Sequence, residues 1–256
     1  PQPPPDPPGL PTNGAGAGAR LLRFVLLALA ALVPAASAGD LALLLSQPAR
    51  TGSQARGDAA LVVGIEAYAY MDDVPYALSD ARAFEEFLVY TRGVPGDRVE
   101  SLTTAPNKEK VLQAWARAAA LVEPGGTLWL YFAGHGALDQ SGRRVLLGAD
   151  TQRDLESFGA RSMAIEDLEA AVAGSPAERI VLVLDACHVG RSRTDTNLLP
   201  GQDRLALSAR EFRPQERTVV WSAASEGQTA KAYPPGRHGA FSLFAIGALR
   251  GWADGE

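Results

Sequence analysis

The chain has 256 residues, of which 46% are hydrophobic and 21% are charged. Such a composition is typical of a globular protein with a substantial core, and the length favours one main domain with an appendage. The formal net charge of −5 provides no basic face that would neutralise phosphates, which excludes nucleic acid as an expected partner.

The N-terminal region has two parts of different composition. Residues 1–19 are rich in Pro, Gly and Ala and contain almost nothing that could pack, so we expect them to be disordered. Residues 20–38 begin with basic side chains, continue with an apolar run and end in Ala-Ser-Ala, which are the three parts of a secretory signal peptide. A membrane anchor is the alternative, although the run is shorter than the ~20 residues that span a bilayer. We therefore expect an exported protein, periplasmic or extracellular, or a membrane-anchored one, with residues 39–57 as a linker.

Strands and helices are expected to alternate from Asp58 onward. Short apolar runs bounded by glycine or polar turns predict buried strands. Apolar side chains at helical spacing predict helices, one of them capped by Asn107. The expected strands are 59–63, 99–103, 127–132, 180–184 and 218–222, with a small hairpin arm at 145–147, and the expected helices carry the apolar positions of 78–88, 111–122, 165–172 and 241–249. This alternation predicts an α/β fold with a mostly parallel central sheet and helices on both faces.

Nucleotide chemistry is not expected from this pattern. The first strand is not followed by the glycine motif of a dinucleotide-binding fold, and no Gly-rich loop ends in Lys-Ser or Lys-Thr. Three scattered histidines and one cysteine also provide no close-spaced pair of metal ligands, so no metal site is expected.

Two of the expected strands end in residues that can carry chemistry. One strand runs into Gly134-His135-Gly136, and another runs into Asp185-Ala186-Cys187. Ligands bind at the carboxyl edge of an open parallel sheet, so His135 and Cys187 would emerge side by side there if the two strands are neighbours. A lone cysteine is more often a small buried apolar residue, and it is this position that favours a nucleophile.

In that arrangement the imidazole of His135 would take the proton of the Cys187 thiol and leave a thiolate nucleophile. The glycines on either side of the histidine leave the backbone open, so that a substrate carbonyl can approach. We expect the backbone N–H groups of Gly136 and Cys187 to bind the oxyanion that develops on that carbonyl.

Six short segments together suggest a family, although no single one of them is specific. They are residues 59–65, 78–81, 131–136, 185–190, 222–225 and 238–241. With these segments, residues 59–252 resemble the caspase-like cysteine peptidases of the metacaspase and bacterial orthocaspase kind. The resemblance implies a caspase-like three-layer sandwich and a cysteine endopeptidase that works through a thioester, with His135 and Cys187 as its catalytic dyad.

The resemblance also implies roles for two acidic residues. Asp80 and Asp185 match the carboxylates that line the first specificity pocket of metacaspases. Two carboxylates at the base of a pocket select a Lys or Arg side chain, so the expected partner is a protein or peptide with a basic residue before the cut bond. Without the resemblance, Asp80 is interpreted as an acid near a helix start and Asp185 as a strand-end cap.

Some positions depart from the pattern of the family. Ala133 and Val189 stand where related enzymes have serine, which leaves substrate preference open. The stretch 138–144 lacks the acidic cluster of calcium-dependent metacaspases and offers Asp139 followed by two arginines. No cofactor, calcium included, is therefore expected.

Two further questions stay open at the level of sequence. Residues 191–217 form a long polar stretch rich in arginine, which is either a segment that the enzyme cuts in itself or a solvated loop. The whole domain has an alternative function as a catalytically inactive caspase-fold interaction or signalling module, because a fold does not fix a function. His238, in a Gly-rich segment, is interpreted as a loop residue, with a place in the substrate pocket as the alternative.

Overall fold

The structure is a computed structural model that describes residues 45, 47–188, 193, 197–199, 209–224 and 229–252. The predicted disordered segment 1–19, the predicted signal peptide or anchor 20–38, Val189 and most of the arginine-rich stretch lie outside these residues. The described residues all belong to one compact unit, Ala38–Glu256. Among them, no helix is both long and apolar enough to cross a membrane.

A five-stranded sheet forms the centre of this unit, in the order β2-β1-β3-β7-β8. Every neighbouring pair in it is parallel, which confirms the predicted sheet. The strands are β1 (Ala59–Gly64), β2 (Val99–Leu102), β3 (Thr127–Ala133), β7 (Arg179–Asp185) and β8 (Thr218–Ser222). Side chains of β1 and β3 are buried along their whole length, as expected for strands that are covered on both faces.

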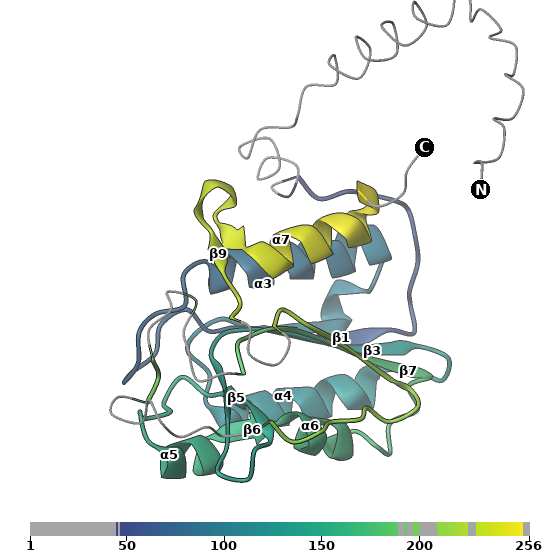
Figure 1. The fold of residues 1–256 in the computed structure, drawn as a ribbon. Coiled ribbons are helices and arrows are strands. Elements are labelled where there is room, and N and C mark those ends of the chain that lie inside the picture. Colours follow the sequence, from purple (N-terminus) through teal and green to yellow (C-terminus); the bar gives the residue numbers. More distant parts are fainter. Residues whose placement is uncertain are drawn as a thin grey trace, which may run out of the picture. The chain divides into compact units, whose positions relative to one another are not determined.

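Helices cover both faces of the sheet and complete the three layers (Figure 1). One face carries α3 (Ala77–Glu86) and α7 (Ala240–Gly247), and the other carries α4 (Lys108–Leu121) and α6 (Ile165–Ala171). Asn107 caps α4 as predicted, because its side chain accepts a hydrogen bond from the backbone N–H of Lys110 at 3.1 Å. The indole of Trp115 in α4 donates to the Leu168 carbonyl of α6 at 2.9 Å.

Several smaller elements extend this frame. Two helices continue as π-helical turns, Phe87–Arg92 after α3 and Ala248–Trp252 after α7, and a 3-10 turn, Gly96–Arg98, precedes β2. The predicted hairpin arm is the middle strand of an antiparallel sheet of β4 (Gly136–Leu138), β5 (Arg144–Leu147) and β6 (Ser162–Ala164), with the helix α5 (Leu155–Ala160) before β6. A hairpin of β9 (Ala232–Tyr233) and β10 (His238–Gly239), joined by the 3-10 turn Pro234–Gly236, leads into α7.

One glycine sets how closely α3 approaches the sheet. A Cβ at Gly64, the last residue of β1, would lie 2.7 Å from Cβ of Ala81 and 2.9 Å from the carbonyl oxygen of Ala77. The first turns of α3 can therefore rest directly on the carboxyl end of β1. This contact carries Asp80, in the first turn of α3, to the edge of the sheet where the candidate site lies.

The part of residues 39–57 that the structure describes runs along the domain. Its backbone is bonded to the turn after α3: the N–H of Ala55 donates to the Gly93 carbonyl at 3.1 Å, and the hydroxyl of Thr91 donates to the Ala49 carbonyl at 2.7 Å. Leu45 is buried, and its carbonyl accepts from Arg250 at 2.7 Å. The expected linker thus has contacts with the domain in its described part.

The start of β1 depends on Asp58, whose buried carboxylate connects three segments. Its oxygens accept from the backbone N–H of Thr127 at 2.9 Å, from the indole of Trp129 at 3.1 Å and from the Arg92 guanidinium at 3.0 Å.

Replacing Asp58 by Ala leaves two buried donors without an acceptor, so we expect a loss of about 3 kcal/mol in the free energy of unfolding. Urea denaturation followed by circular dichroism measures the loss. Asp97→Ala, at an exposed carboxylate, is the control and should cost less than about 0.5 kcal/mol; equal losses in the two variants would contradict this role of Asp58.

Candidate active site

The two chemistry-bearing segments lie next to each other at the carboxyl edge of the sheet. β3 and β7 are neighbours, with Ala133 opposite Asp185 in register. The N–H of Gly134 donates to the Asp185 carbonyl at 3.3 Å, so the chain segments beyond the two strands stay together. His135 and Cys187 each follow two residues after these paired positions, which places them at one rim, where ligands bind in open parallel sheets.

The imidazole of His135 is held in one orientation and one tautomer. Its Nε2 lies 2.7 Å from the carbonyl oxygen of Asp72. A carbonyl can only accept, so Nε2 carries the hydrogen and Nδ1 is left with its lone pair. The ring of Tyr68 packs against the imidazole with the centroids 4.6 Å apart, and its hydroxyl accepts from the backbone N–H of His135 at 2.8 Å.

Burial lowers the pKa of His135 to about 4, and the hydrogen bond to Asp72 opposes only part of this effect. The imidazole is therefore neutral at neutral pH. A neutral imidazole with Nδ1 free can accept a proton, but the lowered pKa makes it a weaker base than an exposed histidine.

Cys187 is buried, and its thiol contacts a segment that follows β8. The Sγ atom accepts from the backbone N–H of Ala230 at 2.8 Å and lies 3.7 Å from the carbonyl oxygen of the same residue. Burial raises the pKa of the Cys187 thiol, so the protonated form is favoured in this arrangement. In the part of the chain that the structure describes, no hydrogen bond joins Cys187 to His135.

The backbone predicted to bind an oxyanion lies close to Cys187. Gly136 begins β4, and a Cβ placed on it would lie 2.5 Å from the carbonyl oxygen of Cys187. No other residue type fits there without a shift of the backbone. The part played by the N–H groups of Gly136 and Cys187 in binding an oxyanion stays a prediction.

Asp80 and Asp185, the two acidic residues singled out from the sequence, lie together beside this edge and are fully buried. Asp80 accepts from Nδ1 of His238 at 2.8 Å and from the backbone N–H of Gly239 at 3.0 Å. Asp185 accepts from the hydroxyl of Ser242 at 2.5 Å and from its N–H at 3.3 Å. The hairpin of β9 and β10 and the start of α7 thus pack against the two carboxylates, which were predicted to line an acidic pocket.

A guanidinium lies between these carboxylates. Nη1 of Arg193 is 2.9 Å from Asp80 and donates to the carbonyl of Pro75 at 2.8 Å, and Nη2 is 2.9 Å from Asp185. The Arg193 side chain is only 2% exposed. Burial lowers the pKa of this guanidinium, but the two carboxylates more than offset that effect and raise it, so Arg193 is charged. Burial also raises the pKa of Asp185, while the adjacent Arg193 opposes the rise.

The comparisons with known proteins agree with this architecture. The family model of the caspase domain (Peptidase_C14) matches residues 58–255. The chain belongs to the caspase domain family. Among solved structures, protein GSU0716 from Geobacter sulfurreducens is 18% identical, with a TM-score of 0.54 over 77% of this chain and 82% of that one. Caspase-1 from Spodoptera frugiperda is 14% identical, with a TM-score of 0.49 over 80% of this chain and 73% of that one. No curated protein is significantly similar in sequence.

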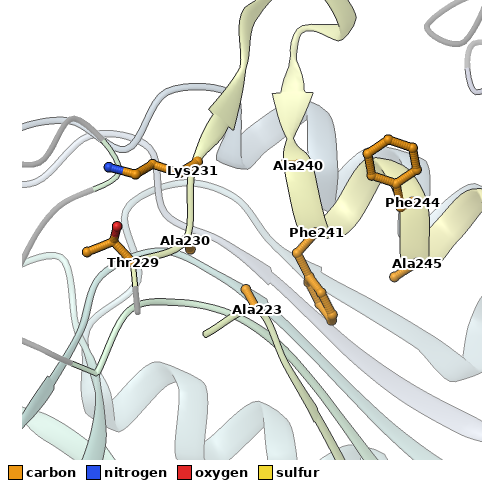
Figure 2. A pocket seen from close by; sticks show the side chains of 8 residues that line it. All are labelled: Ala223, Thr229, Ala230, Lys231, Ala240, Phe241, Phe244 and Ala245. Atoms are coloured by element: carbon orange, nitrogen blue, oxygen red, sulfur yellow. The ribbon is translucent and has the colours of Figure 1, made fainter. Parts of the chain in front are cut away.

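An apolar groove of about 570 Å³ lies beside Cys187 in this caspase domain. Ala230, whose N–H is bonded to Cys187, and Lys231 lie on one wall, and the side chains of Phe241 and Phe244 come from α7 on the other (Figure 2). Phe244 is 56% exposed. The groove therefore offers apolar surface close to Cys187.

Four residues of this site, Asp72, Tyr68, Ser242 and Arg193, have no clear signal in the sequence. The carbonyl of Asp72 acts through the backbone, and any residue could provide it. Tyr68 and Ser242 are ordinary residues whose role appears only when their partners are known. Arg193 is one of several arginines in a polar stretch. His238 was interpreted from the sequence as a loop residue, with a place in the substrate pocket as the alternative; it begins β10, and its Nδ1 lies 2.8 Å from Asp80.

In the stretch 138–144, which was compared with the calcium site of metacaspases, Asp139 is bonded to neighbouring residues. Asp139 accepts hydrogen bonds from the N–H and hydroxyl of Ser141 and from the backbone and Nε of Arg143, the last at 2.9 Å. Within the described ranges, no group of three or more His, Cys, Asp or Glu side chains is arranged to hold a metal ion. The expectation that no cofactor is required stays a prediction.

The stability of the domain should depend on two buried histidines. Burial lowers the pKa of His188 to about 4, as it does for His135, from the usual 6.5. The unfolded chain takes up these protons below pH 6.5 and the folded chain does not, so stability is present above pH 6.5 and is lost as the pH falls toward 4. Between pH 6.5 and pH 4, each of these histidines should lower the free energy of unfolding by about 3 kcal/mol. We expect His188→Gln to remove its share, so that the free energy of unfolding, measured in urea between pH 7 and pH 4, falls less steeply than in wild type. Parallel curves would show that His188 is protonated in the folded state or is exposed.

Proposed function

We propose that this caspase domain is a cysteine endopeptidase that cuts peptide bonds after Arg or Lys. The observation that carries the proposal is the Arg193 guanidinium between Asp80 and Asp185, beside the strand end that bears Cys187. A pocket that accepts this guanidinium has the charge and the hydrogen-bond acceptors for the arginine side chain of a substrate, and for a lysine with fewer contacts.

In the proposed reaction, Nδ1 of His135 takes the proton of the Cys187 thiol, and the thiolate attacks the carbonyl carbon after the basic residue. The backbone N–H groups of Gly136 and Cys187 bind the oxyanion. The imidazolium then gives its proton to the leaving amine, and a thioester remains on Cys187. Water attacks the thioester, His135 accepts the proton of that water, and the acid product leaves as the thiol forms again. The Asp72 carbonyl keeps the imidazole oriented and stabilises its charged form.

One observation favours the alternative function, a catalytically inactive interaction or signalling module. The Sγ of Cys187 is bonded to Ala230 and not to His135, and burial raises the pKa of the thiol. For catalysis, the thiol must turn from Ala230 toward the imidazole. In a module without activity, the Cys187 thiol would keep its contact with Ala230.

Peptide cleavage separates the two functions. Fluorogenic peptides that end in Arg, Lys, Asp or Ala are offered to wild type, Cys187→Ala and His135→Ala. We expect kcat/KM for the Arg and Lys peptides to exceed that for the Asp and Ala peptides by about 100-fold, since only a basic side chain pairs with the buried carboxylates. Cys187→Ala should be inactive, and His135→Ala should lose about 1,000-fold because the general base is gone.

Turnover of the Asp peptide alone would retain the peptidase and refute the roles of Asp80 and Asp185. If no peptide is cut, the inactive module becomes the better account. The same wild-type and Cys187→Ala samples, run on a gel after incubation, test the proposed self-processing within residues 191–217. Identical bands would contradict it. Export or anchoring through residues 20–38 is likewise a proposal, on residues outside those described.

A further inference from the structure

We propose that Arg193 is an internal occupant of the acidic pocket that keeps substrate out until it is withdrawn. The inference rests on the proposed function, because it concerns access to the same pocket. It goes further by naming the group that a basic substrate must displace and by predicting that this group raises KM in the wild-type chain.

The Arg193 side chain lies where the proposed pocket would bind the basic side chain of a substrate. Its guanidinium reaches both carboxylates at 2.9 Å and adds a hydrogen bond to the Pro75 carbonyl at 2.8 Å. Its contacts are therefore the ones that the pocket would offer to the side chain of a substrate arginine. The residue comes six positions after Cys187 in the sequence, so the occupant belongs to the segment that leaves the reaction centre.

The pairing is incomplete for a permanent structural ion pair. Nη2 of Arg193 pairs with Asp185 at 2.9 Å, but among the described residues Nε of Arg193 and Oδ1 of Asp185 have no hydrogen-bond partner, although both atoms are buried. Buried charges in a fixed structural role normally have their donors and acceptors satisfied. Unused acceptor capacity on Asp185 is what a site needs if it is to bind an incoming donor in a better geometry.

The pocket has room for one guanidinium at a time. A Cβ on Gly239 would lie 2.8 Å from Nη2 and 2.9 Å from Cζ of Arg193, and it would also collide with Asp185. The backbone of Gly239 and the two carboxylates therefore enclose the group tightly. A substrate arginine and Arg193 cannot occupy the pocket together, so binding of substrate requires that Arg193 leaves.

Competition from within the chain is strong because the competitor is tethered. A short tether gives an effective concentration on the order of millimolar. A substrate at micromolar concentration must compete with Arg193 at this effective concentration. Its apparent affinity is therefore lower than its affinity for an empty pocket. Removing Arg193 should consequently lower KM far more than it changes kcat.

The first experiment compares cleavage of a peptide ending in Arg by wild type, Arg193→Ala and Arg213→Ala. Arg213 is the matched control, an arginine of the same polar stretch whose side chain is 83% exposed and pairs with Glu211. We expect kcat/KM to rise at least about 10-fold in Arg193→Ala, mainly through KM, and to stay unchanged in Arg213→Ala. A folded Arg193→Ala protein with wild-type or lower kcat/KM overturns the proposal.

Loss of Arg193 leaves two carboxylates without a counter-ion, so the alanine variant could fail to fold. Arg193→Lys keeps the charge, but a lysine cannot reproduce the guanidinium whose two Nη atoms pair with Asp80 and Asp185. We then expect a rise of several fold in kcat/KM with a melting temperature near that of wild type. Wild-type kinetics in a folded Arg193→Lys protein would overturn the proposal as well.

Binding without cleavage separates this inference from the proposed function. A fluorescent peptide ending in Arg is titrated against Cys187→Ala and Cys187→Ala/Arg193→Ala, and anisotropy gives the Kd. Binding at least about 10-fold tighter in the double variant supports the occupant even if no variant cuts a peptide, in which case only the peptidase fails. Equal binding in both proteins, together with equal cleavage by wild type and Arg193→Ala, refutes the occupant and leaves the peptidase in place.

Discussion

Two buried carboxylates that cannot remain uncompensated determine the organisation of this site. Asp80 and Asp185 are both fully buried at the carboxyl edge of the sheet, and an unpaired buried charge is strongly destabilising. A cation must lie between them, and in this structure it is the guanidinium of Arg193. Under the proposed function, the basic side chain of a substrate would replace Arg193 and balance the same two charges.

The same few segments connect this pocket to the reaction centre. β7 carries Asp185 into the pocket and Cys187 to the rim two residues later. The segment before α3 holds the imidazole of His135 through the Asp72 carbonyl and holds Arg193 through the Pro75 carbonyl, and Asp80 follows in the first turn of α3. The segment before α3 therefore contacts both His135 and Arg193.

The sequence was a good guide to whatever depends on local pattern and a poor one to contacts between distant residues. Continuous apolar runs predicted the strands of the sheet, and the Asn107 cap was recognisable from its position before an amphipathic helix. The edge that brings His135 near Cys187 followed from strand ends alone. By contrast, Arg193 meets Asp80 across more than a hundred residues, and a backbone carbonyl such as that of Asp72 has no residue-type signal. Only tertiary packing could show that Ala230 lies against the thiol.

The most direct test of the account is covalent labelling of Cys187 by two matched peptidyl ketone electrophiles, one ending in Arg and one in Asp. Labelling accumulates even when the pocket is open for a small fraction of the time, so intact mass spectrometry can detect it in the wild-type chain. The account predicts that the Arg reagent modifies Cys187 and that the Asp reagent does not, with the Arg reaction slowed in Asp185→Asn. Equal labelling by both reagents, or labelling by the Asp reagent alone, would contradict the claim that the buried carboxylates select a basic side chain.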